Sequence, residues 1–208
     1  KVGSEVSVGQ SIGMKDETAA RCFATHNLTL SLIISLVWAS VLFAFSVPIV
    51  DFYELKSHIA QDAVNYLRTV STAFPFVLMS AAATGIFNAS GRSKIPFTIN
   101  GVGLVINMVL DPLFIFVFDW KTDGAAWATW IAQACVFTSF VYQLKFKQIL
   151  WDNFCFFGKL KKPYTKRIIQ IGFPVATLNT LFAFVNMFLG RTASTVGGHL
   201  GLMAMTTS

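Results

Sequence analysis

The chain has 208 residues, of which 54% are hydrophobic, 14% aromatic and only 12% charged, and its formal net charge is +6. Soluble domains carry about 25% charged residues, so this composition excludes an ordinary soluble protein. The basic residues lie in alternate loops between apolar stretches, which indicates membrane orientation and not nucleic-acid binding. We therefore expect an all-α integral membrane protein, a polytopic helix bundle in contact with the lipid bilayer.

Five apolar stretches each approach the ~20 residues that a helix needs to cross a bilayer. The predicted spans are residues 28–49, 66–87, 96–118, 124–144 and 168–189. Residues 1–13 resemble the last turns of a further span, and residues 199–208 resemble the first turns of another. Because the first residue is Lys1 and the last residues enter a new apolar stretch, we expect a fragment of a longer protein.

The loops between the spans alternate in charge. One set of loops holds twelve of the sixteen basic residues, and the positive-inside rule places that set in the cytoplasm. Segment 145–167 belongs to it, and we interpret this segment as a basic linker between residues 1–144 and residues 168–208. Such a linker suits either a solvated interfacial position or the binding of anionic headgroups. Directly after it, Gly172 and Pro174 predict a break or kink near the start of a span.

A polar stripe runs along one face of the span 96–118. A rotation of about 100° per residue places Asn100, Asn107 and Asp111 within about 40° of one another on a helix. A carboxylate in hydrocarbon costs about 2.5–3.5 kcal/mol on insertion scales, so the stripe must face other helices or water. We interpret Asp111 as a functional residue. The alternative is a structural ion pair with a partner elsewhere in the protein.

The next span contributes Thr129, which is predicted at a similar depth to Asp111. Each residue lies about 8–10 Å from the outer end of its helix. With Asn107 they form an oxygen-rich set that suits Na⁺ as a bound metal ion, or a proton on Asp111. These three residues are therefore the predicted cation site.

Other intramembrane polar residues are candidates for lining a substrate cavity. They are Asn100, Gln133, Ser80, Thr84 and Asn179. Ser80 and Thr84 lie among alanine and glycine residues, a pattern that is equally typical of close helix packing. Asn179 suits either a pocket or a hydrogen bond between helices.

The sequence contains no Gly-rich phosphate loop and no HExxH. The three cysteines and three histidines do not have the spacing of metal ligands. We expect no enzymatic activity and no cofactor.

Several segments resemble motifs of the multidrug and toxic compound extrusion (MATE) family. They are residues 85–97, 107–116 and 124–129, with 10–17 and 171–174 as further landmarks. Members of this family are twelve-helix transporters with two lobes. The resemblance implies antiport by alternating access, in which H⁺ or Na⁺ flows inward while drugs, toxic compounds or organic cations are exported. It also implies a monomeric multi-pass protein of the inner (plasma) membrane, with a small organic cation as substrate.

The resemblance also assigns parts of the chain. Residues 1–144 would hold the end of helix 2 and helices 3–6 of the amino-terminal lobe. Residues 145–167 would be the cytoplasmic inter-lobe linker, and 168–208 would be helix 7 and the beginning of helix 8. Asn107, Asp111 and Thr129 match the family's amino-lobe cation site, whose partner carboxylate on helix 1 is not in this chain.

One departure from the family pattern favours a particular branch. Phe182 stands where some relatives carry an acidic residue, and this resembles the DinF-like branch. Two other functions remain open. One is a lipid-linked oligosaccharide flippase of the same MOP superfamily, although the spans offer only Arg68 and Arg191 for a pyrophosphate group. The other is a membrane scaffold that transports nothing.

Overall fold

The computed structural model describes residues 1–53, 57–147, 150–151, 154–158 and 160–206, and for residues 57–58 and 190–206 it describes the backbone alone. The helices are α1 (Val2–Gly13), α2 (Glu17–Ala44), α3 (Ser46–Asp51), α4 (Ser57–Ala89), α5 (Lys94–Pro112), η1 (Leu113–Val117), α6 (Lys121–Val141), η2 (Tyr142–Phe146) and α7 (Lys162–Thr206). The short segments η1 and η2 are π-helical. Residues 148–149, 152–153 and 159 of the predicted linker, and residues 207–208, lie outside the described residues.

Five helices in the described part of the chain are long and apolar enough to cross a membrane. They cover Glu17–Ala44, Ile59–Ala89, Lys94–Val117, Lys121–Phe146 and Lys162–Leu189. The prediction of an all-α membrane bundle with five spans is therefore confirmed. Large apolar side chains such as Trp38, Val105 and Phe182 are exposed on these helices, as expected for surfaces that face lipid.

Helix α2 begins well before the predicted span at residue 28. Asp16 caps it, because its carboxylate accepts a hydrogen bond from the backbone N–H of Ala19 at 2.9 Å. His26 and Asn27, which the hydropathy pattern placed outside the span, are buried and hydrogen-bonded. Their polarity therefore does not end the helix.

Helix α7 also differs from its predicted form. It begins at Lys162, before the predicted start at residue 168, and it continues through Pro174 to Thr206. No break therefore interrupts the helix near Gly172, whereas the kink predicted there as the alternative and the further span predicted at residues 199–208 stay predictions.

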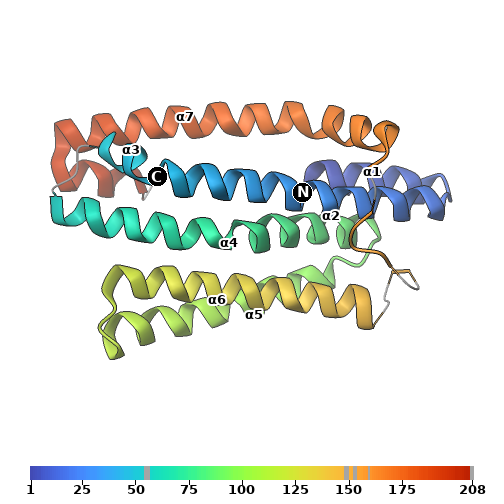
Figure 1. Ribbon diagram of the computed structural model, residues 1–208, viewed down its shortest axis with the longest axis horizontal. Helices are drawn as coiled ribbons and strands as arrows, with labels where there is room; N and C mark the ends of the chain where they lie inside the picture. Colours follow the sequence, from blue (N-terminus) through green and yellow to red (C-terminus); the bar gives the residue numbers. More distant parts are fainter. Residues whose placement is uncertain (54–56, 148–149, 152–153, 159, 207–208) are drawn as a thin grey trace.

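The helices pack in layers, as Figure 1 shows. Helix α4 lies at the centre and contacts α1 and α2 on one side and α6 on the other. Helix α7 packs against α1 and α2, whereas α5 packs mainly against α6. The candidate site on α5 and α6 is thus on the opposite side of the bundle from α7.

Small residues make the contact between α1 and α4 close. The hydroxyl of Ser4 donates to the carbonyl of Ala82 at 3.1 Å, and both residues are buried. A Cβ added to Gly85 would lie 2.7 Å from the carbonyl oxygen of Lys1 and 3.0 Å from the Cβ of Ser4. This part of α4 therefore serves close helix packing, the alternative that its alanine and glycine residues indicated.

Part of the predicted linker packs against α2. The carbonyl of Cys155 accepts from Thr25 Oγ1 at 2.9 Å, and His26 Nε2 accepts the backbone N–H of Lys161 at 2.9 Å. Because Nε2 is an acceptor, the proton of the neutral His26 ring is on Nδ1, which donates to the carbonyl of Cys22 at 2.7 Å. Phe154 belongs to the hydrophobic core. The two-lobe division of the chain stays a prediction.

Substitution of Gly85 by alanine tests the α1–α4 contact. The added Cβ would force the two backbones apart, and overpacking of this kind costs about 1–3 kcal/mol. We expect Gly85→Ala to lower the thermal unfolding temperature of the full-length protein in detergent. Gly101→Ala is the matched control, since a Cβ at Gly101 meets nothing within 4 Å. An equal effect of both substitutions would contradict this account of the contact.

Substitution of His26 tests the attachment of the linker. His26→Leu removes the acceptor of the Lys161 N–H, and loss of an ordinary hydrogen bond of this kind costs about 0.5–1.5 kcal/mol. We expect trypsin to cut after Lys161 at least about fivefold faster in the native His26→Leu variant than in the native wild type. His26→Gln retains an acceptor and should restore most of the resistance. Unchanged cutting of His26→Leu would argue against the hydrogen bond.

Candidate functional site

Two glycines allow α5 and α6 to approach each other closely. A Cβ added to Gly124 would lie 2.9 Å from the carbonyl carbon of Phe114. Toward the opposite end of the pair, Gly103 lies directly against the side chain of Val136. Membrane helices pack most closely where one of them offers a small residue. These two contacts fix the register of α5 against α6.

Two polar side chains of α5 form hydrogen bonds to neighbouring helices, one between the levels of these glycine contacts and one beyond Gly103. Asn107 Nδ2 on α5 donates to Thr129 Oγ1 on α6 at 3.4 Å. About two turns away along α5, Asn100 Nδ2 donates to Thr84 Oγ1 on α4 at 3.5 Å. Both hydrogen bonds are long. Two residues of the predicted polar stripe, Asn100 and Asn107, therefore contact neighbouring helices, although Asn100 remains exposed.

A cavity of about 290 Å³ lies along this stripe. Its lining residues are Asn100, Gly103, Leu104, Asn107, Thr129, Ala132, Gln133 and Val136. Four of the residues selected from sequence thus line one cavity. The pattern of polar residues missed Gly103 and Leu104, although both lie on the same helical face as Asn100 and Asn107.

Asp111 lies one turn beyond Asn107, between the levels of the two contacts Asn107–Thr129 and Phe114–Gly124. Its Oδ1 atom is excluded from solvent and has no hydrogen-bond partner among the described residues. At this level α6 contributes residues 125–128, which include no basic side chain. A buried carboxylate oxygen in this situation requires a proton, a cation or a donor from another part of the protein.

The predicted depth of Thr129 needs a correction. Thr129 is level with Asn107, and it lies about 6 Å deeper than Asp111, which is one helical turn. Helix α6 begins at Lys121, three residues before the predicted start of its span at residue 124, and this adds nearly one turn above Thr129. The sequence pattern did not show this extra turn.

Two of the predicted cavity residues lie elsewhere. Ser80 is buried in α4, and its hydroxyl has no partner among the described residues. Asn179 is exposed on α7, which packs against α1 and α2. The structure therefore does not bring either residue to the cavity between α5 and α6.

A metal centre built from ionisable side chains is absent from the described residues. No group of three His, Cys, Asp or Glu side chains lies together there. A metal cation at Asp111 would therefore depend on the neutral oxygens of Asn107 and Thr129, which suit Na⁺ better than a transition metal.

The sequence model of the MatE family matches residues 1–113, which is more than half of the chain. The chain belongs to the MATE family. It is 28% identical, over 97% of its length, to the probable multidrug resistance protein YoeA of Bacillus subtilis, of which it covers 47%. It is 24% identical, over 90% of its length, to the multidrug export protein MepA of Staphylococcus aureus, of which it covers 42%.

Solved structures of MATE transporters share the fold. The chain aligns to an inward-facing multidrug resistance MATE transporter of the MOP superfamily with a TM-score of 0.89 and 23% identity, over 99% of this chain and 47% of that one. The chain thus spans about half the length of most of the relatives it matches. The predicted family, fold and multi-pass membrane character are confirmed, whereas the DinF-like branch stays a prediction.

The stability of an Asp111→Asn variant distinguishes a functional carboxylate from a structural one. If Asp111 has no permanent partner, the neutral amide removes a buried charge, and the thermal unfolding temperature of the full-length protein should stay unchanged or rise by a few degrees. Asp123→Asn is the control, since that carboxylate is exposed in the first turn of α6. A marked fall for Asp111→Asn alone would identify a structural ion pair.

Proposed function

We propose that this MATE chain is part of a secondary active transporter that exports organic cations in exchange for H⁺ or Na⁺. The observation that carries the proposal is the solvent-excluded Oδ1 of Asp111, which lacks a partner and lies one turn from the Asn107–Thr129 bridge. A carboxylate in that position favours a ligand that neutralises it, because neutralisation removes the cost of the buried charge.

The neighbouring side chains supply further oxygen ligands. The amide nitrogen of Asn107 is engaged by Thr129, so the amide oxygen remains available to a cation. The hydroxyl oxygen of Thr129 has a second lone pair for the same purpose. Carboxylate, amide and hydroxyl oxygens are the ligands that hard cations prefer. A proton would instead reside on Asp111 alone.

The cavity next to this site gives coupling a physical basis. Asn107 and Thr129 contribute to both the cation site and the cavity wall, so a bound cation alters the surface that a substrate meets. Exchange requires only that the ion and the substrate favour different conformations. Rocking of two lobes about linker 145–167 would then expose the site alternately to each side of the membrane.

Two considerations favour organic-cation export over flipping of a lipid-linked oligosaccharide. The relatives from B. subtilis and S. aureus carry the names multidrug resistance protein and multidrug export protein. A pyrophosphate cargo would need accessible cations, but Arg68 is engaged with Ser46 at 3.0 Å and with the ring of Phe43.

The decisive experiment measures efflux of a cationic dye from cells that express the full-length protein. Efflux is compared under an imposed pH gradient and an imposed Na⁺ gradient. We expect Asp111→Asn to reduce gradient-driven efflux at least about tenfold, because the amide cannot take up a proton and binds Na⁺ weakly. Equal transport by wild type and variant under both gradients would refute the coupling role of Asp111.

Thr129→Val separates the two possible ions. Loss of the hydroxyl removes an oxygen ligand of Na⁺, so Na⁺-driven efflux should fall while proton-driven efflux changes little. Thr72→Val is the matched control, since the Thr72 hydroxyl is exposed and bonds only to Thr69 within its own helix. Equal losses for Thr129→Val and Thr72→Val would argue against a cation site at Thr129.

A further inference from the structure

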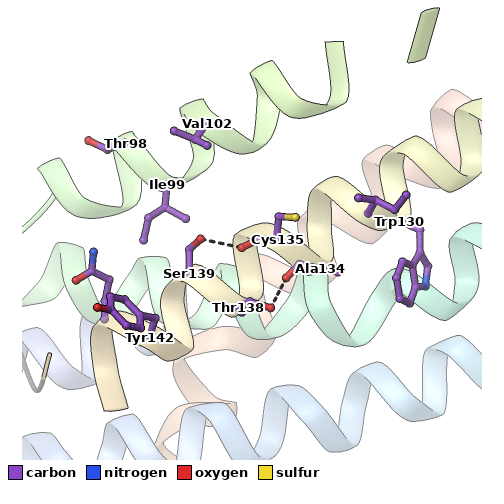
Figure 2. Close-up of a pocket in the computed structure, with 11 residues that line it drawn as sticks. Thr98, Ile99, Val102, Trp130, Ala134, Cys135, Thr138, Ser139 and Tyr142 are labelled. Carbon is purple, nitrogen blue, oxygen red and sulfur yellow. Dashed lines mark hydrogen bonds between the residues drawn. The ribbon is translucent and has the colours of Figure 1, made fainter. Parts of the chain in front are cut away.

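A second and larger cavity, of about 650 Å³, lies between α5 and α6 on the side away from Asn107 and Thr129. Figure 2 shows this groove with Thr98, Ile99 and Val102 of α5 on one wall and residues from Trp130 of α6 to Tyr142 of η2 on the other. Figure 1 shows α5 and α6 at the edge of the bundle. We call this cavity the α5–α6 groove.

The polarity of the α5–α6 groove changes along its length. Its deep end, toward the middle of the spans, is lined by Val102, Trp130 and Ile131. Near the end that the positive-inside rule places in the cytoplasm it is lined by Ser139 and Gln143, with further hydroxyls from Thr98 and Thr138. The groove is therefore apolar in the hydrocarbon core and polar toward the interface. An amphiphile with one chain along the groove matches this gradient.

A positive charge lies at the polar end. The ammonium group of Lys147 is 5.8 Å from the centre of the Tyr142 ring, and Tyr142 lines the groove. Lys94, at the start of α5, and Lys145, in η2 directly after α6, lie at the same end of the helix pair as Lys147 and are exposed. Each Lys or Arg near an anionic membrane surface contributes about 1 kcal/mol of attraction. The mouth of the groove thus favours an anionic headgroup.

An unsatisfied acceptor lies beside this charge. The side-chain oxygen of Gln143 is excluded from solvent and has no hydrogen-bond partner among the described residues. The hydroxyls of Thr138 and Ser139 already donate to the carbonyls of Ala134 and Cys135, as Figure 2 shows, so they do not satisfy Gln143. The position calls for a donor from a ligand, and a headgroup hydroxyl is such a donor.

We propose that the α5–α6 groove binds an anionic phospholipid of the cytoplasmic leaflet, with one acyl chain along Val102 and Ile131, the phosphate near Lys147 and a headgroup hydroxyl at Gln143. The length of the groove agrees with the length of one acyl chain. Trp130 and Tyr142 are about 18 Å apart along α6, and half of the hydrocarbon core of a bilayer is about 15 Å thick. One acyl chain therefore reaches from the mouth of the groove to its deep end.

The test uses the full-length protein in nanodiscs of phosphatidylcholine that contain a trace of phosphatidylglycerol with a photoreactive acyl chain. Peptide mass spectrometry then locates the attachment sites. We expect them to concentrate on groove residues such as Val102, Ala134 and Cys135. Unlabelled phosphatidylglycerol should displace the probe at least about fivefold better than phosphatidylcholine with the same chains.

Three variants test the parts of the site. Lys147→Gln should reduce the advantage of phosphatidylglycerol about fivefold, whereas Lys121→Gln, at the opposite end of α6, should not. Cys135→Trp fills the groove and should abolish labelling there, whereas Val105→Trp, on an exposed position outside the groove, should not. Gln143→Leu should remove the preference for phosphatidylglycerol over phosphatidylmethanol, which has the same charge and no headgroup hydroxyl.

Several results would overturn the proposal. One is labelling spread evenly over the apolar surface, and another is equal displacement by both lipids. Absence of labelling from the groove would mean that another segment of the protein or a second copy covers it. Displacement by the cationic transport substrate in place of the anionic lipid would assign the groove to the substrate pathway.

Discussion

Hydrocarbon offers no hydrogen-bond partners, and this constraint determines where the polar residues of this chain lie. Ser4 and Asn27 satisfy it in the contacts among α1, α2 and α4, and Asn107 satisfies it by bridging α5 to α6. Four buried side-chain atoms among the described residues do not: the oxygens of Ser80, Asp111, Gln143 and Thr165. Two of these, Asp111 and Gln143, lie at the positions where geometry and charge independently favour a ligand. At these two positions the unsatisfied atom therefore supports the proposed ligand, whereas at Ser80 and Thr165 it points to none.

The sequence predicted the features that depend on one helix at a time. Hydropathy located the five spans, and the helical period grouped Asn100, Asn107 and Asp111, because lipid-facing and inward-facing positions differ in composition along a single helix. Features that depend on a second helix were predicted less well. The early start of α2 required the burial of His26, and this depends on the backbone of Lys161 far away in the chain.

The candidate site illustrates the same limit. Thr129 was correctly placed against the polar stripe but about one turn from its true level, because the hydropathy pattern started the span at residue 124 whereas α6 begins at Lys121. Asn179 was grouped with the cavity residues on polarity alone, and the position of α7 separates it from them. The α5–α6 groove left no clear sequence signal. Its polarity gradient exists only when Thr98 of α5 and Ser139 of α6 lie side by side.

The two proposed sites share one structural element. The contacts of Gly103 and Gly124 hold α5 and α6 together, with the cavity of Asn107 and Thr129 on one side of the seam and the α5–α6 groove on the other. A lipid in the groove and a cation at Asp111 therefore act on the same helix pair. If each ligand favours a different separation of α5 from α6, thermodynamic linkage requires that each changes the affinity of the other by the same factor. Without a change in that separation, the two sites are independent, since no side chain lines both cavities.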